Sequence, residues 1–221
     1  MKMKQVISTG ILATCLATAV SAQDNLSFGP TAGFGHTWLS NAENSRYQPA
    51  GNLGVSLIFS PATHWGIGAD AKWSIEGNKT SANGIDVTNR IDYLRIPLKG
   101  IYFFGEYGQR VRPKLAFGPT FGFLLGGKQE RTYMDDGHEV TVKTPVKDFV
   151  KSFDFGLTGS AGVNIRLLEK TWLNLDLGYY HGLTDVMEST DVDQKNRNLS
   201  MNVGLTFGIG KATVENSPAN R

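Results

Sequence analysis

The sequence predicts an all-β fold, namely an eight-stranded antiparallel up-and-down transmembrane β-barrel. Three observations lead to this prediction. Apolar residues alternate with small or polar residues in eight segments, which is the period of a strand with two different faces. The connections between the segments are alternately short and long. The polar face is mostly glycine, serine, threonine and asparagine, with a few charges of both signs.

Residues 1–22 have the pattern of a cleaved signal peptide. Lys2 and Lys4 precede an apolar run that begins at Val6 and ends at Val20, and small residues lead to a plausible cleavage point after Ala22. The run has about 15 residues, fewer than the roughly 20 that a membrane-spanning helix needs. We therefore expect this segment to direct export and then to be removed.

Composition narrows the possible classes of protein further. The single cysteine, Cys15, lies inside the apolar run. A lipidated Cys15 is the weaker alternative, because Thr14 is larger than the residues usual before such a cysteine. Cleavage after Ala22 leaves no cysteine for disulfides or metal binding. It also lowers the formal net charge from +2 to 0, because two lysines and no acid are removed. A neutral chain lacks the basic surface of nucleic-acid-binding proteins.

The eight alternating segments each approach the 9–11 residues that a tilted strand needs to cross a bilayer. Alternation is weaker in the first and fourth segments and clear in the other six. We expect one barrel domain over residues 23–210, followed by a polar tail over residues 211–221. In chain order the segments are Leu26–Leu39, Asn52–Ser60, Trp65–Glu76, Ile91–Phe104, Lys114–Leu125, Phe153–Leu167, Leu173–Tyr180 and Asn198–Ile209.

The connections predict which ends of the strands share a side of the membrane. Outer-membrane barrels have short periplasmic turns and long external loops. Three short and four long connections fit eight strands with both termini in the periplasm. In the third long connection, Asp136-Gly137 has the sequence of a two-residue hairpin turn. The short connections are Pro61–His64, Gly105–Val111 and Leu168–Lys170, and the long ones are Ser40–Gly51, Gly77–Arg90, Gly126–Phe149 and Asp185–Arg197.

Aromatic residues gather near the expected strand ends. Rings at both ends of the strands are typical of the girdles at membrane interfaces. This placement supports a membrane barrel. The residues are Trp38, Trp65, Trp73, Tyr102, Phe104, Phe123, Trp172, Tyr180 and Phe207.

The polar face decides between a membrane barrel and a soluble lipocalin-like barrel, which is apolar inside. A water-exposed face would be rich in lysine and glutamate, whereas this face is small and mostly uncharged. We therefore expect apolar side chains outside and a charged cluster inside, where opposite charges pair. Glu76, near the rim, and Arg112 share this face. The predicted interior cluster is Asp70, Lys72, Arg95, Lys99, Lys114, Asp154, Arg166 and Asp176.

No pattern in the sequence predicts an active site, a cofactor or a metal. The four histidines share no metal-ligand spacing. His181 could act as a base in a lipid-modifying barrel enzyme, but an interfacial position explains it better. The acidic run around Asp135 and Glu139 could bind a cation, but the hairpin turn is the simpler interpretation. We expect a protein that is not an enzyme.

Five short motifs resemble the porin-family outer-membrane β-barrels of Bacteroidetes that are described as PorT-like. The resemblance implies an eight-stranded barrel without a cofactor. Arg95 departs from the family, which usually has glutamate there, and the polar tail replaces the usual terminal aromatic residue. The motifs are Tyr93–Leu98, Phe117–Pro119, Asp154–Gly156, Gly178–Asp185 and Asn196–Ser200.

The expected function is that of an integral outer-membrane protein with a structural role or with contacts made by its external loops. Two alternatives remain open: an accessory component of a protein secretion system and a soluble periplasmic lipocalin-like carrier. The expected partners are outer-membrane lipid, the barrel-insertion machinery and a protein that could bind the external loops. Eight strands leave a lumen that side chains fill, so the word porin does not by itself predict a pore.

Overall fold

The computed structural model describes residues 25–42, 44–106, 108–188 and 193–209. The predicted signal peptide (1–22) and polar tail (211–221) lie outside these ranges. No helix among the described residues is long and apolar enough to cross a membrane. The strands are β1 (Leu26–Leu39), β2 (Ser45–Arg46), β3 (Pro49–Phe59), β4 (Trp65–Ala82), β5 (Ile85–Phe103), β6 (Val111–Asp135), β7 (His138–Pro145), β8 (Phe153–Leu168), β9 (Thr171–Gly182) and β10 (Asn196–Ile209), and η2 (Val146–Asp148) is a 3-10 helix.

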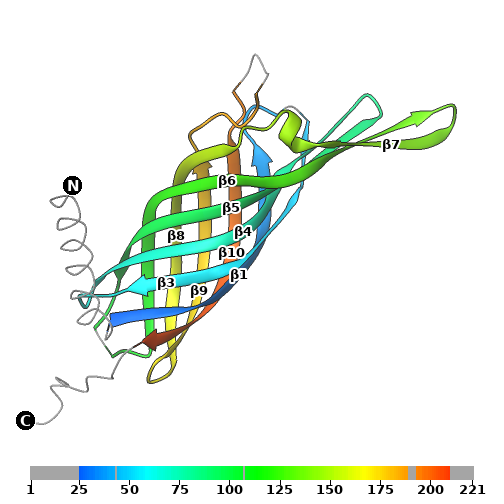
Figure 1. Cartoon of the computed structure of the whole chain (residues 1–221). Coiled ribbons are helices and arrows are strands. Elements are labelled where there is room, and N and C mark those ends of the chain that lie inside the picture. The colour runs from blue at the N-terminus through cyan, green and yellow to red at the C-terminus, as the bar shows by residue number, and fades with distance from the viewer. Residues whose placement is uncertain (1–24, 43, 107, 189–192, 210–221) are drawn as a thin grey trace, which may run out of the picture.

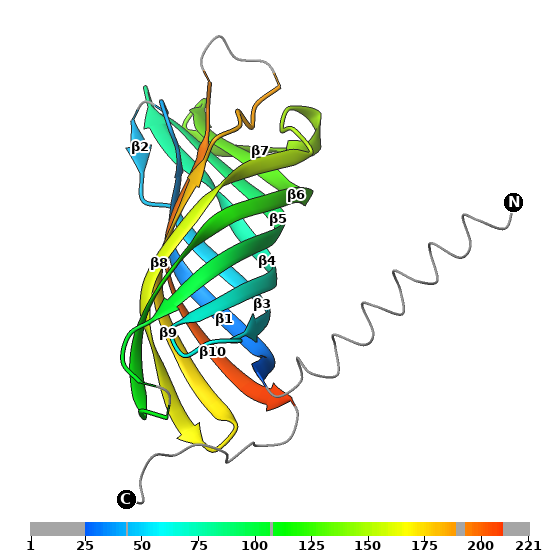
Figure 2. The same cartoon turned by 90° about the vertical axis from the view of Figure 1, so that its left-hand side faces the viewer.

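Eight of these strands form a closed antiparallel ring in the order β1-β3-β4-β5-β6-β8-β9-β10 (Figures 1 and 2). The ring closes between the first and last strands, where Leu26 lies opposite Ile209 and Leu39 opposite Asn196. Because each strand pairs with the next one around the ring, the topology is up-and-down. The predicted eight-stranded barrel is therefore confirmed, and β2 and β7 are short additions beyond its rim.

The two faces of the ring have opposite chemistry. On the outside, side chains such as Leu53, Ile67 and Phe117 remain 58%, 62% and 62% exposed. Inward positions on the same strands are polar and buried, including Ser56 and Asp70. A lipocalin-like barrel would have the reverse arrangement. In lipid, closure also pairs the backbone groups that an open sheet edge would leave unsatisfied.

The predicted long connections Gly77–Arg90 and Gly126–Phe149 are largely strand, which corrects the expectation of polar loops. Strands β4, β5, β6 and β7 continue past the barrel as a sheet, which we call the external sheet (upper right in Figure 1). The sequence pattern failed here because a strand with solvent on both faces need not alternate in polarity. The short turns lie at the opposite end of the barrel, together with the start of β1 at Leu26 and the end of β10 at Ile209.

Two tight turns end the hairpins of the external sheet. Asp136 and Gly137 have φ angles of 45° and 80°, which confirms the predicted hairpin turn. Asn83 and Gly84 form a second such turn, with φ angles of 51° and 75°. Asn-Gly is the strongest short hairpin signal in a sequence. It could therefore have revealed the β4–β5 hairpin.

Most of the predicted girdle residues are on the outside, and two are not. Tyr180 is only 7% exposed and faces the lumen. Trp172 lies opposite Thr206, a buried inward residue, and thus has the inward register as well. Both residues follow the alternation of β9, in which even-numbered positions face inward. Whether a residue of β9 has an even or an odd number therefore predicts its face of the barrel better than its closeness to a strand end does.

The outward apolar band predicts a depth-dependent cost for charge. Phe117 lies near the middle of the outward face of β6, and Phe123 lies toward its external rim. We expect Phe117→Arg to lower the free energy of unfolding by about 2–4 kcal/mol and Phe123→Arg by about 0–1 kcal/mol. Urea titration of the barrel in lipid vesicles measures both. Equal effects of the two substitutions would contradict this placement of the bilayer.

Candidate functional site

A network of eight paired charged side chains lies in the lumen. It contains four cations and four carboxylates, so its formal charges cancel. Strand alternation places all of them inward, and each has an oppositely charged group within 3.0 Å. Buried charges of this kind are tolerated when they are paired and hydrogen-bonded. The eight are Asp70, Lys72, Glu76, Arg95, Lys99, Lys114, Asp154 and Asp176.

Asp70 on β4 is the centre of one group of contacts. Its Oδ2 atom lies 2.7 Å from Lys99 Nζ and 3.0 Å from Lys72 Nζ. Its Oδ1 atom accepts a hydrogen bond of 2.7 Å from the Ser56 hydroxyl. One carboxylate thus ties together β3, β4 and β5, and it neutralises only one of the two ammonium groups that it contacts.

Arg95 on β5 is the centre of the second group. Its guanidinium donates to both carboxylate oxygens of Glu76 on β4, at 2.8 and 2.5 Å. Nη2 also lies 2.8 Å from Asp154 Oδ2 on β8, and Nη1 donates to the Tyr180 hydroxyl at 3.2 Å. The rings of Tyr93 and Tyr180 lie 4.3 and 4.4 Å from the guanidinium carbon. Arg95 therefore has both charge partners and two aromatic faces.

Asp154 extends this group across the lumen. It is fully buried, and it accepts hydrogen bonds from Asn196 Nδ2 at 2.8 Å and from the Thr184 hydroxyl at 2.9 Å. Asn196 begins β10, which lies opposite β5 in the ring. The chain of contacts from Arg95 to Asn196 consequently connects opposite walls of the barrel.

Two glycines make room for these large groups. A Cβ atom at Gly122 would overlap Nη1 of Arg95, and a Cβ at Gly156 would lie 2.7 Å from the Tyr180 hydroxyl. The abundance of glycine on the inward face is thus partly explained by the size of the side chains that fill the lumen.

Lys114 on β6 completes the network. Its ammonium group lies 3.0 Å from Asp176 Oδ2 and donates to Asn174 Oδ1 at 2.9 Å, both on β9. The Asn174 amide in turn donates to the Thr206 hydroxyl on β10 at 3.0 Å. This line of contacts crosses the periplasmic half of the lumen.

A polar cavity of about 100 Å³ remains among these side chains. The charged residues other than Asp154 line it, together with serine, threonine and asparagine. The side-chain carbonyl oxygens of Asn52 and Asn202 accept no hydrogen bond from the described residues. A polar cavity of this volume can hold water. It is much smaller than a ligand pocket of about 300–1,000 Å³.

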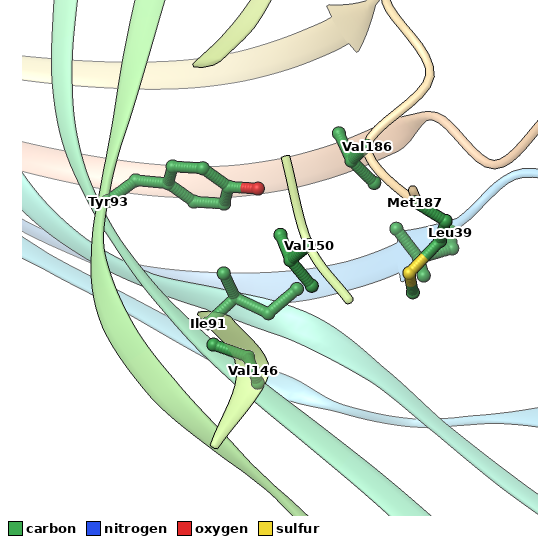
Figure 3. Packing of buried hydrophobic residues seen from close by; sticks show 7 residues of the cluster. All are labelled: Leu39, Ile91, Tyr93, Val146, Val150, Val186 and Met187. Atoms are coloured by element: carbon green, nitrogen blue, oxygen red, sulfur yellow. The ribbon is translucent and has the colours of Figure 1, made fainter. Parts of the chain in front are cut away.

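A cluster of buried apolar side chains, which we call the plug, lies toward the external end of the lumen, and Figure 3 shows its packing. The connections β7–β8 and β9–β10 fold inward, and their residues Val150 and Met187 form a β-bridge. The plug rests on Ile91 and Tyr93, which are completely buried on the inward face of β5. Its residues are Leu39, Ile91, Tyr93, Val146, Val150, Val186 and Met187.

A second apolar cluster narrows the periplasmic end. It comprises Ile58, Ile101, Phe103 and Ala116 from β3, β5 and β6. The Arg112 guanidinium lies 4.9 Å from the Phe103 ring and donates to the Thr63 carbonyl. The polar cavity thus lies between two apolar clusters, one toward each end of the lumen.

The structure brings seven of the eight predicted cluster residues together. The exception is Arg166, which has the predicted inward register near the periplasmic end of β8 but forms no ion pair with a described residue and does not line the cavity. Glu76, expected near the rim, is instead only 2% exposed and is a principal partner of Arg95. Tyr180 was missed because it was assigned to the girdle.

The eight charged side chains of the network bind one another and are not left free to react. Each cation and carboxylate of the network already has a partner of opposite charge, which holds the side chain in position. His181 lies outside the lumen, against the Tyr179 ring at a centroid distance of 6.1 Å. Within the described ranges, no group of three or more histidine, cysteine, aspartate or glutamate side chains is arranged to hold a metal ion.

A closed antiparallel ring with an apolar outer band and a charge-paired interior defines an outer-membrane β-barrel protein. Residues 21–188 match the family model described as outer membrane protein beta-barrel domain. The match covers more than half of the chain, and the chain belongs to this family. No curated protein matches the sequence significantly.

The solved structures that are similar to this chain share little of its sequence. The chain is similar to Neisserial surface protein A, with 13% identity, a TM-score of 0.50 and coverage of 84% of this chain and 97% of that one. It is also similar to a major outer membrane protein of Thermus thermophilus, with 14% identity, a TM-score of 0.48 and coverage of 82% and 98%. At such identities the comparison with the Neisserial protein supports the fold alone.

Removal of Arg95 should leave two carboxylates without their cation. We expect Arg95→Leu to lower the free energy of unfolding by about 3–5 kcal/mol, as when one partner of a buried ion pair is deleted. Adding Glu76→Gln and Asp154→Asn should restore much of the loss, because the two carboxylates that lost their cation are then replaced by neutral amides. Urea titration of the reconstituted barrel measures both variants. An Arg95→Leu barrel as stable as the wild type would contradict the proposed network.

The plug connections should loosen in acid. Burial raises the pKa of Asp185, but hydrogen bonds from Lys151 Nζ at 2.6 Å and from the Gln194 and Met187 backbone amides outweigh this and lower the pKa overall. A depressed folded-state pKa stabilises the plug above about pH 4 and ceases to do so as the pH falls through the folded value. The protection factors of residues 184–188 in hydrogen exchange, which correct for the intrinsic pH dependence of amide exchange, should therefore fall in acid.

Asp185→Asn provides the comparison for this pH effect. Its protection factors should be lower than those of the wild type near neutral pH and should change less on acidification. If both proteins respond equally to acid, the Asp185 carboxylate does not hold the plug.

Proposed function

We propose that this protein is a non-enzymatic integral outer-membrane barrel that acts through its external surface, either structurally or by binding a partner. The observation that carries the proposal is the contrast between its two ends. Side chains fill the lumen, with the plug toward one end and the periplasmic cluster toward the other, whereas β4 to β7 continue outward as an ordered sheet.

The enclosed lumen argues against transport as the main activity. A solute would have to displace the plug and then break ion pairs such as Arg95–Glu76 and Lys114–Asp176. Barrels that conduct water-soluble solutes freely usually have about 16–18 strands. Insertion by the barrel-insertion machinery and anchoring in outer-membrane lipid fit the same proposal.

The external sheet is the part best suited to contacts outside the cell. Met134 at its tip is 63% exposed and Val142 is 46% exposed. Regular pairing from Lys128 opposite Pro145 to Asp135 opposite His138 keeps these residues in an ordered hairpin. An ordered binding surface loses less conformational entropy on binding than a flexible loop does.

An accessory role in protein secretion, of the PorT-like kind, is the second candidate. It is favoured by β7, which pairs with β6 and with no other described strand. An edge strand offers backbone groups to which an extended segment of another chain can add. Co-purification of the intact barrel with a secretion complex would distinguish this role from a purely structural one.

A liposome-swelling assay tests the main proposal. We expect wild-type barrel in liposomes to give no swelling with small sugars, while a 16-stranded porin reconstituted in parallel gives rapid swelling. A change of mobility between boiled and unboiled samples on cold SDS gels would establish that the inserted barrel is folded. Swelling by folded wild-type protein would contradict the proposal and indicate a channel.

A further inference from the structure

The outward face of the external sheet contains two pairs of like charges that lie directly opposite each other. Arg90 on β5 faces Lys128 on β6, and Arg46 on β2 faces Lys79 on β4. The two pairs share one face, because Lys79 lies opposite Thr88, two positions from Arg90. Like charges directly opposite each other destabilise a sheet. We call these four residues the basic patch.

The basic patch begins where the apolar outer band ends. On β4 the outward residues Trp73 and Ile75 are followed by Gly77, which lies opposite Arg90. On β6 the exposed Leu125 is followed within three residues by Lys128. The hydrocarbon region ends with the apolar band, so the patch lies at the depth of the lipid headgroups on the external side.

Neighbouring carboxylates neutralise the patch only in part. Lys79 lies 3.7 Å from Asp86, and Lys128 lies 2.9 Å from Glu130. Glu130 also contacts a fifth cation, Lys143, at 3.5 Å. The four residues of the basic patch and the three carboxylates Asp86, Glu130 and Asp92 on the same face leave a net charge of +1. Lys143, which shares Glu130, raises it to +2.

We propose that the basic patch binds the phosphate-bearing headgroups of the outer leaflet in which the barrel is embedded. A phosphate between Arg90 and Lys128 would accept hydrogen bonds from both and remove their mutual repulsion. Arg90, Lys128 and Arg46 are exposed and thus accessible to a headgroup. Binding at this patch would fix the depth and rotation of the barrel and orient the external sheet above the membrane.

Binding of a phosphorylated glycolipid tests the proposal. Full-length barrel in a nonionic detergent is titrated with fluorescent diphosphoryl lipid A, and anisotropy reports the dissociation constant. A basic residue near an anionic surface contributes about a fivefold change in affinity. We expect Arg90→Gln to bind about fivefold more weakly, and Arg90→Gln with Lys128→Gln about 25-fold more weakly. Enzymatically dephosphorylated lipid A should bind the wild type far less.

Arg131→Gln is the matched control. Arg131 is an exposed residue of β6 that lies opposite Val87, so it belongs to the other face of the same sheet. It should retain wild-type affinity, and all variants should keep the mobility shift of a folded barrel. Equal loss in Arg131→Gln and Arg90→Gln would overturn the proposal, as would equal binding of dephosphorylated lipid. Binding of dextran sulfate but not of lipid A would also overturn it and indicate a soluble polyanion as the ligand.

Discussion

A guanidinium group inside a barrel that lipid surrounds must find its counter-charges within the same lumen. Arg95 does so through Glu76 on β4 and Asp154 on β8, and Asp154 is itself held by Asn196 on β10. The contacts of Asp154 with Arg95 and with Asn196 connect strands that are not paired with each other in the ring. Much of the interior follows from them, because Gly122 and Gly156 leave space for the large groups and Tyr93 and Tyr180 cover the guanidinium faces.

The balance of charge in the lumen also explains why its interior can be polar and yet enclosed. A soluble protein buries apolar side chains because water surrounds it, whereas this barrel presents them to lipid. The interior must then be filled by groups that satisfy one another. Apolar clusters occur where the lumen meets water, around Val150 externally and around Phe103 at the periplasmic end. The ion-pair network lies between these two clusters.

The external sheet extends the same strands into a different environment. Beyond Ile75 and Leu125 the outward positions change from apolar to charged, and the inward positions Asn78 and Asn89 bond to each other above the lumen. The hairpins therefore need no separate fold, since the pairing of the barrel strands continues into them, with a register shift between β5 and β6 at Asp92 and Tyr93. The surface that faces the exterior is thus built directly on the strands that cross the membrane.

The sequence by itself determined the strand number, the topology and the orientation of the faces. The alternation of apolar and polar residues in segments such as Trp65–Glu76 depends only on neighbouring residues. It can therefore be recognised without knowledge of distant contacts. The alternation also selected seven of the eight residues that form the network of ion pairs in the lumen. The Asp136-Gly137 turn was likewise readable, because its backbone preference is set by two adjacent residues.

The tertiary structure alone decided which inward charges meet and what closes the barrel. Glu76, Arg95 and Asp154 are far apart in sequence, and their distances depend on strand stagger around the ring. Arg166 also faces inward, but it lies too near the periplasmic end of the barrel to reach these three residues. The plug could not be foreseen either, because Val150 and Met187 come from connections without periodicity. Periodicity specifies a face, whereas contact also requires height along the barrel axis.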